Sequence, residues 1–171
     1  TTSDSLSDFS ERLLQNLSED GMRNAEIILK VRELVLAGHD RILVFAINVR
    51  HAITLSSILN YNGFPSDVIT GETDQAVRRR AISQFKEEGG GHRILCNYGV
   101  LTTGFDAPKT SAAVIARPTE SLVLYSQMVG RVIRGPRVKG TEKAEIWTIV
   151  DTNLPGFGGL VEGFTNWDDV W

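Results

Sequence analysis

Short apolar segments of strand-forming residues alternate with segments of helical periodicity along most of this chain. The strand-like segments are residues 41–46, 66–70, 92–96, 112–116 and 144–150. Helical spacing marks segments between them, at residues 51–60, 75–88 and 121–132. Strands that alternate with helices require crossover connections, which produce a parallel sheet covered on both faces. We therefore predict an α/β protein with a mostly parallel central sheet flanked by helices.

The two ends of the chain differ from this alternating part. Residues 4–17 and 22–37 also have helical spacing, and a Glu19-Asp20-Gly21 break separates them. We predict that residues 1–40 form N-terminal helices packed on an α/β domain of residues 41–151. Residues 152–171 are expected to be an aromatic tail that docks on this domain, and a stub of a further segment is the alternative.

Composition narrows the classes of protein that this chain can represent. One cysteine among 171 residues excludes an internal disulfide and suits a reducing cytoplasm. Apolar runs are far shorter than the roughly 18 residues of a membrane span, so no membrane partner is expected. The N-terminus shows no export signal, and the missing initiator Met suggests a fragment or a processed chain. We expect a cytoplasmic location.

Charge gives little indication of the partner. The formal net charge of −3 gives no overall attraction to nucleic acid. A local basic surface is still compatible with this net charge. Arg78-Arg79-Arg80 is expected to be a solvated helix face, with a nucleic-acid contact as the alternative.

Polar residues collect where the predicted strands end. Ligands of open parallel sheets bind beyond the carboxyl ends of the strands. The segments at these ends are 47–51, 70–73, 97–106 and 117–120, and they contain amides, hydroxyls and basic groups. Together with helix N-termini, these groups are typical phosphate ligands. The pattern predicts a ligand that carries phosphate.

Missing motifs exclude several kinds of phosphate site. The chain has no Gly-x-x-x-x-Gly-Lys-Ser/Thr loop for a triphosphate, and no Gly-x-Gly-x-x-Gly follows its first strand. The three histidines lack metal-ligand spacing to one another or to Cys96, so no metal site is predicted. Without the first of these motifs, the chain cannot hold a triphosphate in the usual way.

The segment Gln127-Met-Val-Gly-Arg-Val-Ile-Arg134 is the most informative one. Arg131 and Arg134 are three residues apart and lie on one side of the predicted helix, close to its end at Gly135. Arginines at a helix C-terminus also interact favourably with the helix dipole. A solvated helix end is therefore the alternative explanation for the two arginines.

Three segments in register resemble the C-terminal RecA-like domain of superfamily 2 helicases. Residues 127–134 are similar to motif VI of that family, Gln-x-x-Gly-Arg-x-x-Arg. Leu101-Thr-Thr-Gly-Phe-Asp-Ala-Pro108 is similar to motif V, and Leu43-Val-Phe-Ala-Ile-Asn48 to motif IV. Thr70-Gly71 falls where the family has a Thr/His-Gly element. The resemblance spans about residues 41–151 and implies a RecA-like three-layer fold.

Details of the motifs indicate a branch of the superfamily. Motifs V and VI are more similar to the type III restriction-enzyme subunits and DNA-repair helicases than to the DEAD-box RNA helicases. The resemblance therefore favours DNA, or a DNA–RNA structure, over RNA. Met128 stands where many relatives have arginine, which removes one basic contact but leaves Arg131 and Arg134 in place.

The resemblance also implies roles for individual residues. ATP with Mg²⁺ would be held mainly by an N-terminal RecA-like domain, and Arg131 and Arg134 would act on its γ-phosphate as arginine fingers. The positions expected to approach the nucleotide are Gln127, Gly104 and Asp106. The positions expected to contact the nucleic-acid backbone are Thr102, Thr103, Asn48, Arg50, Thr70 and Gly71. The isolated chain is predicted to be inactive.

Local explanations compete with these roles. Thr102 and Thr103 could cap helices, and Asn48 could be the N-cap of the following helix. For the whole chain, the alternatives are a catalytically inert RecA-like regulatory module and a Rossmann-type transferase that uses a nucleotide-sugar.

Overall fold

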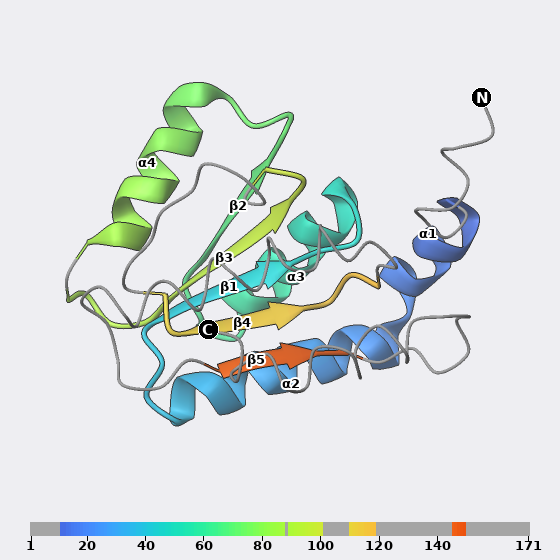
Figure 1. Ribbon diagram of the computed structural model, residues 1–171, viewed down its shortest axis with the longest axis horizontal. Coiled ribbons are helices and arrows are strands. Elements are labelled where there is room, and N and C mark those ends of the chain that lie inside the picture. The colour runs from blue at the N-terminus through green and yellow to red at the C-terminus, as the bar shows by residue number, and fades with distance from the viewer. Residues whose placement is uncertain (1–10, 88, 101–109, 119–144, 150–171) are drawn as a thin grey trace, which may run out of the picture.

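The computed structural model describes residues 11–87, 89–100, 110–118 and 145–149. Four helices are described: α1 (Glu11–Glu19), α2 (Gly21–Leu36), α3 (Val49–Tyr61) and α4 (Gln75–Lys86). The five described strands are β1 (Arg41–Phe45), β2 (Ser66–Thr70), β3 (Arg93–Tyr98), β4 (Ala112–Ile115) and β5 (Glu145–Thr148). From β1 to β3, strands and helices alternate as the sequence predicts (Figure 1). The predicted helix at residues 121–132 and the predicted tail at residues 152–171 lie outside the described residues.

The five strands form one parallel sheet in the order β2-β3-β1-β4-β5. The central strand β1 is buried along its whole length, whereas the edge strands β2 and β5 keep partly exposed residues. A strand that is covered on both faces must be apolar throughout, which explains the unbroken Ile42-Leu-Val-Phe45 run. The prediction of an α/β fold with a parallel central sheet is confirmed.

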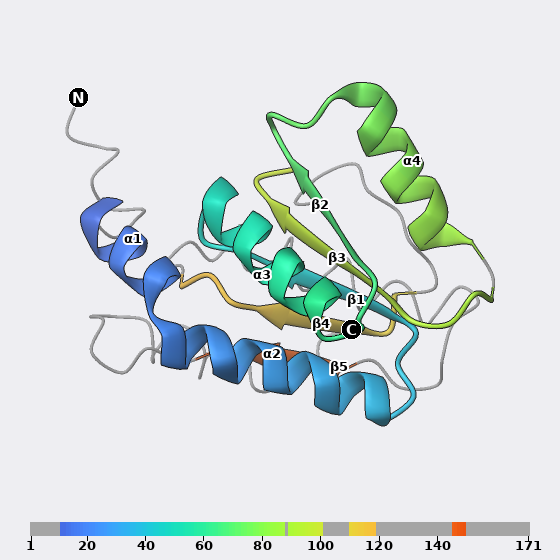
Figure 2. The same cartoon turned by 180° about the vertical axis from the view of Figure 1, so that it is seen from behind.

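Helices α2 and α3 lie side by side over one face of the sheet (Figure 2). The core under them combines apolar residues of α2 and α3 with apolar residues in, or directly after, the strands β1, β3, β4 and β5. Ile27, Leu55, Val44 and Val114 are all fully buried there. Cys96 belongs to this core, and burial raises the pKa of its thiol to about 12. This cysteine is therefore a packing residue and not a reactive thiol.

Several boundaries differ from the predicted ones. Gly21, predicted to be part of a break, is the first residue of α2, because the Asp20 side chain accepts hydrogen bonds from Met22 N and Arg23 N as the N-cap. Strand β3 continues to Tyr98, two residues further than predicted. Tyr98 and Asn97 therefore belong to the sheet and not to the loop after it.

Arg41 stabilises the amino edge of the sheet, the end opposite to the predicted phosphate site. Its guanidinium donates to five backbone oxygens, at distances of 2.6–2.9 Å: those of Asp40, Phe85, Glu87, Gly89 and Gly91. Gly89, Gly90 and Gly91 all have positive φ, which turns this loop around the arginine. The residue is only 2% exposed, and burial lowers the pKa of Arg41 from its ordinary value.

Candidate nucleic-acid interface at the carboxyl edge of the sheet

The first predicted phosphate-binding segment leads from β1 into α3. Asn48 is the N-cap of α3, and its side-chain oxygen accepts from His51 N at 2.7 Å. The structure therefore contains the N-cap that was the local alternative for Asn48. Its amide Nδ2 forms no hydrogen bond within the described residues. Arg50 is exposed in the first turn of α3. The start of α3 thus places an amide donor and a guanidinium at the carboxyl edge of the sheet.

The second predicted segment follows β2. Thr70 is 4% exposed and stabilises the turn, because its hydroxyl accepts from Glu72 N at 3.1 Å and its N–H donates to Thr73 Oγ1 at 2.9 Å. Gly71 is exposed, and no atom lies within 4 Å of the position that a Cβ would occupy there. Gly71 therefore offers open backbone, whereas the Thr70 hydroxyl already accepts one hydrogen bond inside the turn.

The other predicted site residues lie outside the described residues. These are the motif V positions Thr102, Thr103, Gly104 and Asp106, and the motif VI positions Gln127, Arg131 and Arg134. The structure describes the strand that precedes motif V. Asn97, at 1% exposure, donates from Nδ2 to Val44 O at 3.1 Å, and so secures β3 to β1 just before motif V begins.

A buried hydrogen-bond network fixes the loop between β1 and α3. His51 Nδ1 accepts from Ile47 N at 3.1 Å, and its Nε2 lies 2.8 Å from Asn24 Oδ1. Asn24 in turn donates to Ser18 O at 2.9 Å. A ring nitrogen that accepts from a backbone N–H must be unprotonated, so the neutral Nε2–H tautomer is the form that this network holds. The network anchors the Asn48 loop to the start of α2.

The sequence does not predict this network, because no spacing pattern around His51 marks it as part of one. Burial, and then the nearby charge of Arg23, lower the pKa of His51 to about 4. The contact between Asn24 and His51 joins residues 27 positions apart, and no local pattern indicates such a pair.

We expect His51 to make the stability of the fold depend on pH. Its folded pKa of about 4 lies below the ordinary 6.5, so its contribution is complete above pH 6.5 and is lost as the pH falls towards 4. The difference corresponds to about 3 kcal/mol. Urea unfolding should show the free-energy gap between wild type and His51→Gln narrowing by about that amount between pH 7 and pH 4. Parallel pH profiles for the two proteins would show that the histidine does not titrate in this way.

A cation–π pair that the sequence did not predict lies at the same edge. The Arg117 guanidinium carbon, just beyond β4, is 5.4 Å from the ring centroid of Tyr98 at the end of β3. Because β1 separates these two strands, the pair reaches across the central strand. Arg23 of α2 donates to Ala116 O at 2.7 Å in the same region. The carboxyl edge is thus rich in basic groups contributed by separate elements.

The described residues form neither a metal cluster nor a membrane-spanning helix. No three His, Cys, Asp or Glu side chains gather within the described ranges in a way that could hold a metal ion. The helices of those ranges are all too short or too polar to cross a bilayer.

The architecture matches a fold known from solved structures. The DEAD-box protein SrmB of E. coli has the same fold, with a TM-score of 0.65 and 24% identity over 80% of this chain and 78% of that one. Domain 2 of the DEAD-box helicase Mss116p, solved with an RNA duplex, gives a TM-score of 0.62 and 21% identity. This match covers 82% of this chain and 54% of that one. The fold is thus the RecA-like α/β fold.

The family follows from the sequence. The model of the helicase conserved C-terminal domain matches residues 26–136, and the chain therefore belongs to that family. IRC3 of Saccharomyces cerevisiae, provisionally named an ATP-dependent helicase, is 35% identical over 92 residues, which are 54% of this chain.

Two further relatives are named for different nucleic acids. The ATP-dependent DNA helicase uvsW of Enterobacteria phage T4 is 30% identical over 84 residues, or 49% of this chain. The ATP-dependent rRNA helicase RRP3 of Mycosarcoma maydis is 36% identical over 99 residues, or 57% of this chain. The matches cover only 13%, 16% and 17% of the lengths of IRC3, uvsW and RRP3.

Proposed function

We propose that this chain is the second motor domain of an ATP-dependent nucleic-acid helicase or translocase. Membership of the helicase C-terminal family over residues 26–136 is the observation that carries this proposal. The sheet supports it, because Asn48, Arg50 and Gly71 all follow the carboxyl ends of strands that belong to one parallel sheet. Ligands of open parallel sheets bind at that edge.

The proposed chemistry needs two domains. An N-terminal RecA-like domain holds ATP and Mg²⁺, and Arg131 and Arg134 of this chain approach the γ-phosphoryl group when the domains close. Two positive guanidinium forks offset the charge that develops on the equatorial oxygens during phosphoryl transfer. Gln127, Gly104 and Asp106 line the nucleotide side of the cleft. Both arginines are present, which favours an active motor over an inert regulatory copy.

The proposed nucleic-acid contacts form a phosphate track along the carboxyl edge. Its positions are Asn48, Arg50, Thr70, Gly71, Thr102 and Thr103. Exposed Arg50 and the open backbone of Gly71 are the described positions best suited to a phosphate. At the Thr70 turn the contact comes from the Gly71 N–H, because the N–H groups of Thr70, Glu72 and Thr73 are hydrogen-bonded within the turn. Backbone contacts of this kind carry no sequence information.

We propose DNA as the nucleic acid. The motif V and motif VI sequences support this choice, since they are similar to those of the type III restriction and DNA-repair branch. Relatives named for DNA and for RNA both occur, so single-stranded DNA and RNA of equal length are to be compared directly.

The test of the phosphate track is Arg50→Gln in the complete protein. Removing one phosphate contact should weaken single-stranded DNA binding and reduce the slope of log K against log salt by about 0.7. Anisotropy titrations at several salt concentrations measure both quantities. Arg32→Gln on α2 is the matched control, because that arginine is equally a surface residue of a helix but lies away from the carboxyl edge. Equal salt slopes for the two variants would show that Arg50 is not one of the phosphate contacts.

A further inference from the structure

Helix α4 concentrates positive charge on a chain whose net charge is −3. Residues 75–86 contain three arginines and one lysine but no aspartate or glutamate. Three of these cations are consecutive and lie in the N-terminal half of the helix, and no acidic residue stands in its first turn. Since no acidic residue of the helix offsets them, these four cations give α4 a formal charge of +4.

The basic residues cover the outer face of α4. Only Ala81 and Phe85 of this helix are buried, and they turn towards β2 and β3. At about 100° per residue, Arg79 and Lys86 share one outer flank of the helix and Arg80 lies on the other. All three are exposed, whereas Arg78 is half-buried nearer the body of the domain. We call Arg79, Arg80 and Lys86 the α4 basic face.

Small residues separate the two flanks of this face. Ala76 and Ser83 occupy the middle of the outer surface and are exposed. A linear ligand can therefore lie along the helix between Arg80 on one flank and Arg79 and Lys86 on the other.

The two arginines of this face have no charged partner among the described residues. Within the described parts of the chain, neither Arg79 nor Arg80 forms an ion pair or a hydrogen bond through its side chain. Asp74, the nearest carboxylate before the helix, is occupied as its N-cap and accepts from Ala76 N at 2.9 Å. The guanidinium donors remain available to an anionic ligand.

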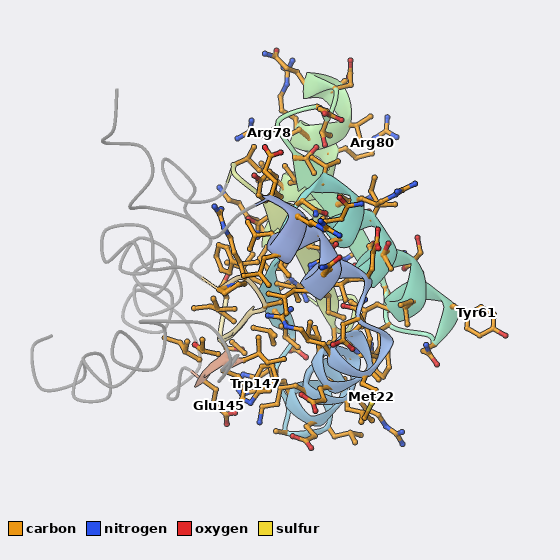
Figure 3. The ribbon with its side chains drawn as sticks, turned by 90° about the vertical axis from the view of Figure 1, so that its right-hand side faces the viewer. Met22, Tyr61, Arg78, Arg80, Glu145 and Trp147 are labelled. Carbon is orange, nitrogen blue, oxygen red and sulfur yellow. The ribbon has the colours of Figure 1, made fainter. Side chains whose placement is uncertain are left out.

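The position of α4 connects this face to the carboxyl edge. The helix begins beyond the carboxyl end of β2, directly after the Thr70–Asp74 turn that contains Gly71 (Figure 1). Arg78 and Arg80 project from opposite sides of α4 at the outer end of the molecule (Figure 3). A strand that leaves the carboxyl edge past Gly71 would therefore meet the first turns of α4.

We propose that the α4 basic face is a second phosphate-binding surface, which takes the nucleic-acid backbone as it leaves the carboxyl edge. This inference rests on the proposed function, because it extends the phosphate track by two to three contacts. Guanidinium groups suit phosphate oxygens, and exposed cations that displace counterions contribute affinity without sequence preference. An acidic protein segment is the other ligand that such a face could take.

The experiment uses the complete protein with the double variant Arg79→Gln/Arg80→Gln. The matched control is Arg12→Gln/Arg32→Gln, which changes the net charge equally at exposed positions of α1 and α2. Single-stranded DNA long enough to extend past the carboxyl edge is titrated by anisotropy at several salt concentrations. We expect the α4 variant to bind about tenfold more weakly than the control and its salt slope to fall by about 1.4. A short oligonucleotide that fills only the carboxyl edge should bind both variants equally.

Three other results overturn the proposal in distinguishable ways. If the α4 variant matches the control on long DNA while Arg50→Gln still loses affinity, the α4 surface fails and the phosphate track stands. If the wild type binds no DNA and neither DNA nor RNA changes its ATPase rate, the proposed function itself fails. If the α4 variant loses affinity for a polyglutamate peptide but not for long DNA, the face recognises acidic protein segments.

Discussion

Replacing Arg131 or Arg134 by alanine in the complete protein should lower kcat for ATP hydrolysis by at least about 100-fold. The proposed contacts form chiefly in the closed transition state, so their loss removes transition-state stabilisation and leaves the folded ground state intact. ATP affinity should change little, because the N-terminal domain holds most of the nucleotide. Steady-state ATPase assays with saturating single-stranded DNA measure the effect.

Thermal melting provides the control for these two variants. Both should melt within a few degrees of wild type, since neither change creates a core cavity if the side chains act in a cleft. Arg131→Lys should also lose most of the rate, because an ammonium cannot form the two parallel bonds of a guanidinium. Normal hydrolysis combined with a large drop in melting temperature would identify the arginines as structural residues.

Arg41→Met should destabilise the fold by about 3 kcal/mol. The change keeps an apolar stem but leaves five carbonyl oxygens without their charged donor. Parts of the 85–91 loop are exposed, so water replaces some of the lost bonds and limits the cost. Urea unfolding monitored by circular dichroism gives the free energy of unfolding.

Arg32→Met is the matched control for this variant. Arg32 is exposed on α2, so its replacement should change stability by no more than about 0.5 kcal/mol. A similarly small effect at Arg41 would mean that the glycine loop keeps its conformation without the guanidinium.

The sequence predicted the elements of the fold better than their arrangement. Apolar runs and helical spacing located every described strand and helix, because burial on both faces of a parallel sheet requires unbroken apolar segments. The strand order was not predictable in this way, since an apolar run shows that a strand is buried but not which strands lie beside it. The polar Ser66-Asp67 start of β2 agrees with its edge position, and the four buried residues of β4 agree with an interior one.

The candidate site was predictable only where neighbours in sequence create it. Asn48 illustrates this, because its spacing to His51 indicated the N-cap that the structure contains. The Asn24–His51 and Tyr98–Arg117 pairs depend on how separate elements pack, and no spacing rule contains that information. Thr70 stays a predicted phosphate ligand, and the structure adds what its residue type did not indicate: its hydroxyl also accepts from Glu72 N within the turn.

The central claim is that hydrolysis requires a second domain to hold ATP, and the isolated chain tests it most directly. We expect the purified 171-residue chain to hydrolyse no ATP with or without single-stranded DNA, because it has no phosphate-binding Gly-x-x-x-x-Gly-Lys-Ser/Thr loop. Adding the N-terminal motor domain, covalently joined, should restore hydrolysis that DNA stimulates and that Arg131→Ala abolishes. DNA-stimulated hydrolysis by the 171-residue chain alone, at the rate of the joined protein, would contradict the two-domain account.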